Sequence, residues 1–231
     1  MQRLENLIDI NDPTDLLSRV ALLSNEKVTF SSSLSAEDQV ITDIIFRNNL
    51  DIEIFTLDTG RMFSETYQTL QKTKEKYQKD IKVYFPDAIE VEELMTEKGA
   101  FSFFDSLENR KECCEIRKVK PLKRALKGKT IWITGIRAEH SQNRTDMVKI
   151  EWDQANDLTK IHPLLSWSAD QVWSYIKENN VPFNVLHNQG FISIGCQPCT
   201  RAIQQHEDFR AGRWWWEEEN KKECGLHSTT H

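Results

Sequence analysis

Apolar residues follow two alternating patterns along the chain. Short runs rich in β-branched and aromatic residues are typical of buried strands, and such runs lie at 27–30, 52–57, 81–85 and 130–134. Between these runs apolar residues recur every three or four positions, which is the spacing of one helix face. Strands that alternate with helices form βαβ units, so the pattern predicts an α/β fold with a mostly parallel sheet flanked by helices.

The pattern predicts three further segments. Helical spacing extends over residues 4–24, and Ser168 is placed as the cap of a helix that runs through Ile176. Residues 146–162 are expected to be irregular or to form a hairpin.

Polar residues follow three of the predicted strands, at positions 31–35, 58–61 and 135–137. Ligands of a parallel sheet bind at the carboxyl ends of its strands, and the free N–H groups at a helix start attract anions. The serines at 31–35 are therefore a candidate anion site, and a plain helix cap is the alternative. Arg137 and Arg144 are seven residues apart and either face one bound anion or lie in a solvated loop.

Composition limits the class of protein. The chain has 231 residues, of which 39% are hydrophobic and 29% charged, and its formal net charge is −6. This size fits one domain with an appendage, and the negative charge disfavours general nucleic-acid binding, which needs an extended basic face. A polar start and the lack of a long apolar run predict neither an export signal nor a membrane span. The odd number of cysteines then favours a cytoplasmic protein whose thiols are ligands or nucleophiles.

The composition changes after Cys199. Residues 201–231 are charged and aromatic and have little helical amphipathicity to hold them on a folded body. We therefore expect an α/β body over residues 1–200 and a mobile C-terminal tail over residues 201–231.

Four of the five cysteines occur in two pairs. Cys113 and Cys114 are adjacent inside the most basic stretch of the chain, and Cys196 and Cys199 form the second pair. Neighbouring side chains diverge, so the first pair makes a poor disulfide, although it can offer two thiolates to a metal centre. Four thiolates suit zinc or an iron–sulfur cluster. Because zinc usually uses two spaced pairs, the spacing favours a cluster and leaves zinc as the alternative.

The fifth cysteine, Cys224, lies in a polar segment near the end of the chain. Its neighbours Lys221 and Lys222 can stabilise a thiolate, which favours a reactive nucleophile. Without a resolving partner, its covalent intermediate must be discharged by an external thiol. Arg210 and Arg213 are three residues apart and can clamp one phosphate or sulfate.

Several motifs occur together in this chain: the Cys113-Cys114 segment up to Leu122, the Cys196-x-x-Cys199 pair, Arg210-x-x-Arg213 followed by three tryptophans, and Glu223-Cys-Gly-Leu-His227. Together they resemble the assimilatory sulfonucleotide reductases, and within that family the cluster-bearing adenylylsulfate (APS) reductases. The resemblance implies a Rossmann-like adenine-nucleotide alpha-hydrolase fold. The turn from Ser31 to Asp38 resembles a modified pyrophosphatase loop of related enzymes. Cluster enzymes usually have a glycine at the position of Ser35, so the choice among Ser31, Ser32, Ser33 and Ser35 as the phosphate contact stays open.

The resemblance also implies a reaction. Cys224 would attack the sulfur of APS, AMP would leave, and thioredoxin or glutaredoxin would release sulfite from a Cys224 S-sulfonate. It implies a homo-oligomer in which each chain holds one [4Fe–4S] cluster. The implied cluster ligands are Cys113, Cys114, Cys196 and Cys199, and the implied substrate-binding residues are Ser32, Leu57, Lys118, Gly135, Arg144, Arg210 and Arg213.

Three other functions stay open. A reductase of the 3′-phosphorylated nucleotide (PAPS), or one that accepts both nucleotides, is the nearest, although such enzymes generally lack the four paired cysteines. An ATP-pyrophosphatase-type enzyme would need an intact Ser-Gly-Gly-x-Asp-Ser loop, which this chain lacks. A non-enzymatic interaction module would hold zinc and use the tail as a partner motif.

Overall fold

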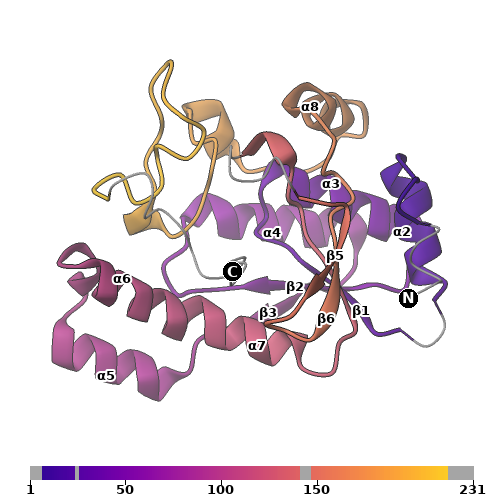
Figure 1. Cartoon of the computed structure of the whole chain (residues 1–231). Helices are drawn as coiled ribbons and strands as arrows, with labels where there is room; N and C mark the ends of the chain where they lie inside the picture. The colour runs from indigo at the N-terminus through magenta and orange to yellow at the C-terminus, as the bar shows by residue number, and fades with distance from the viewer. Residues whose placement is uncertain (1–6, 24–25, 141–146, 218–231) are drawn as a thin grey trace. The chain divides into compact units, whose positions relative to one another are not determined.

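The computed structural model describes residues 7–23, 26–140 and 147–217. Its sheet has six strands in the order β3-β2-β1-β4-β6-β5. Figure 1 shows β5 beside β6. The strands are β1 (Val28–Ser31), β2 (Glu53–Leu57), β3 (Lys82–Tyr84), β4 (Ile131–Ile133), β5 (Ile150–Asp153) and β6 (Leu158–Ile161). β1 pairs in parallel with β2 and β4, β4 pairs in parallel with β6, and β5 and β6 form an antiparallel hairpin. The predicted mostly parallel sheet is confirmed, and the hairpin lies within residues 146–162.

The chain divides into two compact units. The sheet unit comprises residues 1–56, 64–82 and 128–185, and the cysteine unit comprises residues 57–63, 83–127 and 186–231. Helices α2 (Pro13–Ala21), α3 (Ala36–Arg47), α4 (Ser64–Tyr77) and α8 (Ala169–Glu178) belong to the sheet unit, and α5 (Ala88–Lys98), α6 (Leu107–Cys114) and α7 (Lys120–Leu126) belong to the cysteine unit. Each helix among the described residues is too short or too polar to cross a bilayer.

The predicted tail falls only partly within the described residues. Residues 201–217 belong to the cysteine unit, and residues 218–231 lie outside the described part of the chain. The boundary at residue 200 and the mobility of the tail stay predictions.

Two helix starts follow from local sequence. The Asp12 side chain accepts a hydrogen bond from the backbone N–H of Asp15, and Pro13 occupies the first turn, so α2 begins at residue 13. The prediction of a helix over 4–24 was too long, because residues 7–12 are not helical and residues 4–6 lie outside the described chain. The predicted cap at Ser168 is confirmed, and Gln171 completes a capping box there.

The core of the sheet unit joins the central strands to the helices that cover them, through side chains that include Phe30, Ile41, Ile54, Ile133 and Ile161. Each fully buried side chain of this kind contributes roughly 1.5–3 kcal/mol. Helix α3 is buried from Ala36 to Phe46, so it packs on neighbours around most of its circumference. The core therefore fixes α3 against the strands whose carboxyl ends form the candidate anion site.

Polar side chains of α3 also connect it to α4 and α8. Gln39 donates to the Thr73 hydroxyl at 2.7 Å. The carboxylate of Asp43, which has no exposed area, accepts hydrogen bonds from the Tyr77 and Tyr175 hydroxyls at 2.5 and 2.7 Å. Buried hydrogen bonds of this kind are costly to break, so they hold the start of α3 in a defined place.

The turn between β1 and α3 is held by Asp38. Ser33 donates to the Asp38 carboxylate through its backbone N–H at 2.6 Å and through its hydroxyl at 2.5 Å, and the intervening Leu34 takes a left-handed φ of 63°. After β4, a Cβ on Gly135 would lie 1.9 Å from Asp38 Oδ1. Only a glycine can bring the end of β4 this close to the turn, so Asp38 links the ends of two neighbouring strands.

Burial raises the pKa of Asp38 to about 6, and the hydrogen bonds from Ser33 act in the opposite direction. In the unfolded chain the pKa of an aspartate is about 3.9. Between these two values the folded protein holds the proton more tightly than the unfolded chain does. The contribution of Asp38 to stability is therefore fully present below about pH 4 and is lost as the pH rises through about 6.

Replacement of Asp38 tests this linkage. As the pH rises from about 3 to about 7, Asp38 should lower the free energy of unfolding of the parent protein by about 3 kcal/mol, and Asp38→Asn should lack this decrease. Urea titrations of both proteins at about pH 3 and pH 7 measure the difference. Ser33→Ala, which removes one donor to the carboxylate, should extend the decline to higher pH. Stability–pH curves that run parallel in parent and Asp38→Asn would contradict the assignment.

Candidate functional site

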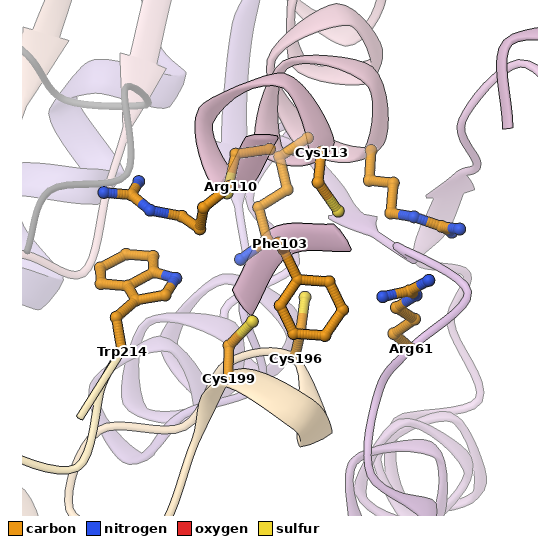
Figure 2. Close-up of a pocket in the computed structure, with 10 residues that line it drawn as sticks. Arg61, Phe103, Arg110, Cys113, Cys196, Cys199 and Trp214 are labelled. Carbon is orange, nitrogen blue, oxygen red and sulfur yellow. The ribbon is translucent and has the colours of Figure 1, made fainter. Parts of the chain in front are cut away.

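A pocket in the cysteine unit brings the four paired cysteines together (Figure 2). It has about 350 Å³ of empty volume, part of it open to solvent. The lining residues are four cysteines, four cationic residues and two aromatic residues: Cys113, Cys114, Cys196, Cys199, Arg61, Arg110, Arg117, Lys118, Phe103 and Trp214. The four predicted ligands and the predicted substrate-binding Lys118 therefore share one site.

One continuous helical stretch supplies half of the lining. Helix α6 ends at Cys114 and passes through a π-helical turn (Glu115–Val119) into α7, which has Pro121 in its first turn. The lining positions 110, 113, 114, 117 and 118 follow the spacing i, i+3, i+4, i+7 and i+8 of one helix face. A π-turn inside a helix is common at functional sites. The helix thus presents two thiols and three cations to the same pocket.

The second cysteine pair lies on a short 3₁₀ turn (Gln197–Cys199). Cys196 and Cys199 are both buried, whereas Cys113 and Cys114 are half-buried. The Thr59 hydroxyl lies 3.3 Å from Cys196 Sγ. Figure 2 shows the sulfur atoms of Cys113, Cys196 and Cys199 directed toward the space between the two segments.

The electrostatics of the pocket oppose thiolates in the absence of a positive partner. Burial, followed by the neighbouring Cys196, raises the pKa of Cys199 to about 12, and Lys118 and Arg213 act in the opposite direction. Burial also raises the pKa of Cys113, against Arg61 and Arg117. Burial therefore disfavours the thiolate forms of Cys113 and Cys199, the forms in which cysteines bind a metal.

The cations of the pocket are held by the surrounding backbone. Arg117 donates to the Thr59 carbonyl oxygen at 2.7 Å, and Arg61 donates to the Ala100 carbonyl oxygen at 2.6 Å. Burial and the neighbouring Arg61 lower the pKa of Arg117. The buried Nε of Arg117 has no hydrogen-bond partner within the described residues. A negatively charged ligand or thiolate would stabilise this group of cations.

The arrangement of the thiols bears on the size of the group that they could hold. Within residues 7–23, 26–140 and 147–217, no three His, Cys, Asp or Glu side chains converge on the position of one metal ion. The thiols instead surround a cavity. The kind of metal centre that these thiols hold stays a prediction.

The two predicted anion-binding arginines lie beside Trp214 in the same unit. The guanidinium carbons of Arg213 and Arg210 are 4.7 and 5.9 Å from the centre of the Trp214 ring. Arg213 is buried, and a Cβ on Gly195 would lie 2.3 Å from its guanidinium, so this arginine is packed against a glycine. Trp214 is buried in the cysteine unit.

The other predicted site residues are spread over both units. Ser32 and Gly135 follow β1 and β4 in the sheet unit, and Leu57 is the last residue of β2. Arg144 and Cys224 lie outside the described residues. The roles of all these residues in substrate binding and catalysis stay predictions.

Five lining residues of the cysteine pocket were not assigned as site residues from the sequence: Arg61, Phe103, Arg110, Arg117 and Trp214. Arg110 and Arg117 had a local signal, because positions 110, 113, 114 and 117 share one helix face. Arg61 belongs to the polar stretch 58–61 noted after a predicted strand, but its place beside the cysteines depends on segments far apart in the chain, as does that of Trp214.

Comparison with known proteins identifies the family. The model of the phosphoadenosine phosphosulfate reductase domain matches residues 27–202. The adenosine 5′-phosphosulfate reductase of Allochromatium vinosum is 48% identical over 93% of this chain and 86% of its own length. The enzyme of the same name from Neisseria meningitidis serogroup A is 49% identical over 88% of this chain and 84% of its own length.

Solved structures agree on the fold. A phosphoadenylyl-sulfate (PAPS) reductase from Candida auris superposes with a TM-score of 0.73 and 28% identity, covering 87% of this chain and 95% of that one. A yeast FAD synthetase superposes with a TM-score of 0.55 and 16% identity, covering 87% of this chain and 73% of that one, which is a likeness of fold alone. The predicted adenine-nucleotide alpha-hydrolase-like fold is confirmed. The chain belongs to the phosphoadenosine phosphosulfate reductase family of oxidoreductases, and within it to the adenosine 5′-phosphosulfate reductases.

Proposed function

We propose that this chain reduces APS to sulfite and AMP in sulfate assimilation. The observation that carries the proposal is its similarity to adenosine 5′-phosphosulfate reductases over nearly its full length, at 48% identity to the Allochromatium vinosum enzyme. The cysteine pocket supports it, because its cationic lining suits a reaction of a polyanionic substrate.

The proposed cofactor is one [4Fe–4S] cluster held by Cys113, Cys114, Cys196 and Cys199. Two features support it: the four thiols surround one cavity, and cations line the same pocket. The buried Nε of Arg117 is a donor that such a centre could satisfy. A bound cluster would supply positive charge to the thiolates and join the two cysteine-bearing segments.

The proposed first step is attack by the Cys224 thiolate on the sulfur of APS. A bond forms between Cys224 Sγ and the sulfur, the bond from that sulfur to the AMP phosphate oxygen breaks, and AMP leaves with the electron pair. Both reactants are negative, so positive charge must lower their repulsion. Lys118, Arg144, Arg210 and Arg213 are the proposed sources of that charge, and Ser32, Leu57 and Gly135 are the proposed nucleotide contacts.

The proposed second step regenerates Cys224. A thiolate of thioredoxin or glutaredoxin attacks Cys224 Sγ and sulfite leaves. The second thiol of the dithiol then resolves the mixed disulfide, so the dithiol is oxidised to a disulfide as APS is reduced by two electrons. Together the two steps balance. A cytoplasmic location and a homo-oligomeric state stay predictions.

Replacement of the nucleophile tests the first step. Cys224→Ser should retain its metal and lose sulfite release, because a serine hydroxyl is too weak a nucleophile at neutral pH. The mass of each protein after incubation with APS and without reductant should show a sulfonate adduct in the parent and none in the variant. Ser228→Ala, in the same terminal segment, is the matched control. Sulfite release by Cys224→Ser at the parent rate would rule out Cys224 as the nucleophile.

The nearest alternative is a reductase of PAPS or of both nucleotides, and the matching family model is named after PAPS reduction. The substrate preference of the enzyme distinguishes this alternative from the proposal. The additional 3′-phosphate of PAPS is a charged group that must be desolvated on binding. A site built for APS should therefore show a kcat/KM for APS at least about tenfold above that for PAPS. Steady-state rates of sulfite release with each nucleotide measure this ratio. A preference for PAPS would replace the assignment with the alternative.

A further inference from the structure

A buried ion pair connects the cysteine helix to the last residue that the structure describes. Arg110 Nε donates to Glu217 Oε1 and Arg110 Nη2 donates to Glu217 Oε2, both at 2.9 Å. The side chains are 1% and 8% exposed. Arg110 precedes Cys113 by three residues on the pocket face of α6. Two parallel bonds between a guanidinium and a carboxylate fix the orientation of both groups.

The backbone of Trp214, whose ring lies beside the Arg110 guanidinium, is strained. Trp214 has a φ of 42°, a value that a bulky side chain rarely adopts, and it is 1% exposed. Its backbone N–H donates to the Cys199 carbonyl oxygen at 3.1 Å, and its own carbonyl oxygen accepts from the Glu217 N–H at 2.8 Å. The guanidinium carbon of Arg110 lies 4.7 Å from the centre of its ring. A strained backbone persists only where its surroundings hold it, and strain of this kind gathers at functional sites.

Residues 213–217 therefore contact both cysteine-bearing segments. Glu217 reaches the segment of Cys113 and Cys114 through Arg110, while Trp214 is bonded to Cys199. The position of Glu217 consequently depends on how the two segments are placed relative to each other within the cysteine unit.

Glu217 also precedes Cys224 by seven residues. Seven residues span at most about 25 Å when fully extended. A fixed Glu217 therefore limits the volume in which the Cys224 thiol can be found, and a displaced Glu217 shifts that volume.

A carboxylate is an unexpected neighbour for this pocket. The site has to accommodate thiolates, and an additional negative charge beside them is unfavourable unless it is paired. An apolar side chain could fill the same space without this cost. The exposed pair Lys98–Glu112, whose members are 38% and 41% exposed, shows that the same helix forms ordinary surface ion pairs as well.

We propose that Arg110 and Glu217 form a positioning pair that couples filling of the four-cysteine site to placement of Cys224. A group bound to all four cysteines fixes both segments, and Arg110 and Trp214 then hold Glu217 at the start of the Cys224 segment. When the site is empty, the two segments are joined less firmly and Cys224 loses its defined starting point. This inference rests on the proposed function of Cys224 as the nucleophile.

The test uses the full chain, purified with its iron, and the isosteric variant Glu217→Gln. We expect unchanged iron content and AMP affinity, and a rate of Cys224 sulfonation by APS in a single turnover that is lower by about tenfold or more, because misplaced reactants lose rate. Arg110→Lys keeps the charge and loses the two parallel bonds, so its rate should be intermediate. Glu112→Gln removes the exposed pair from the same helix and should match the parent protein.

A second measurement needs no substrate. The rate of Cys224 alkylation by iodoacetamide, followed by peptide mass analysis, is compared before and after removal of the iron. Iron removal should change this rate several-fold in the parent protein and in Glu112→Gln, and should change it little in Glu217→Gln, where the link is already broken.

The outcomes separate the two proposals. Two results would overturn the positioning pair. In the first, Glu217→Gln has the sulfonation rate of the parent protein and the same alkylation response to iron removal. In the second, Glu217→Gln loses its iron, which would make the pair a structural support of the cysteine site. A parent protein that forms no sulfonate adduct would overturn the proposed function. Even then, the coupling between the cysteine site and Cys224 would be supported if iron removal changed the alkylation rate of the parent protein and left that of Glu217→Gln unchanged.

Discussion

The gathering of four thiols and four cations around one pocket is the constraint on which the rest of the cysteine unit depends. Burial disfavours thiolates at Cys113 and Cys199. Carbonyl oxygens hold Arg61 and Arg117, and Glu217 pairs with Arg110. The proposed cluster would supply positive charge to the thiolates. The π-turn after Cys114, the glycine beside Arg213 and the strained Trp214 are local departures from regular structure that bring these groups to the same place.

The sheet unit solves a related problem by different means. Asp38 is buried beside the strand ends where a nucleotide is proposed to bind, and its partners are the hydroxyl and backbone N–H of Ser33 rather than a cation. Gly135 approaches the same carboxyl group because it lacks a side chain. Among the described residues, Asp38 and Gly135 therefore hold the ends of β1 and β4 together without a cation.

The sequence predicts the fold well because the strand runs and helix faces have strong local periodicity. The cap at Ser168 is predictable because its partner Gln171 lies only three positions further along the chain. It also identifies both cysteine pairs, because one pair is adjacent and the other has the C-x-x-C spacing of metal ligands. The helix predicted over 4–24 is too long because an apolar period does not show where Asp12 and Pro13 start the first turn. The sequence marks Arg61 as a polar residue after a predicted strand. Its contact with Ala100 and that of Glu217 with Arg110 could not be predicted, because they join residues far apart in the chain.

The central claim is that the four cysteines hold an iron–sulfur cluster. Iron and sulfide analysis of protein purified without oxygen, together with its visible absorption spectrum, tests it most directly. The account predicts a brown protein with about four irons and four sulfides per chain, as four cysteine ligands allow. A colourless protein with one zinc per chain and no iron would contradict it, and would make the four cysteines a structural zinc site.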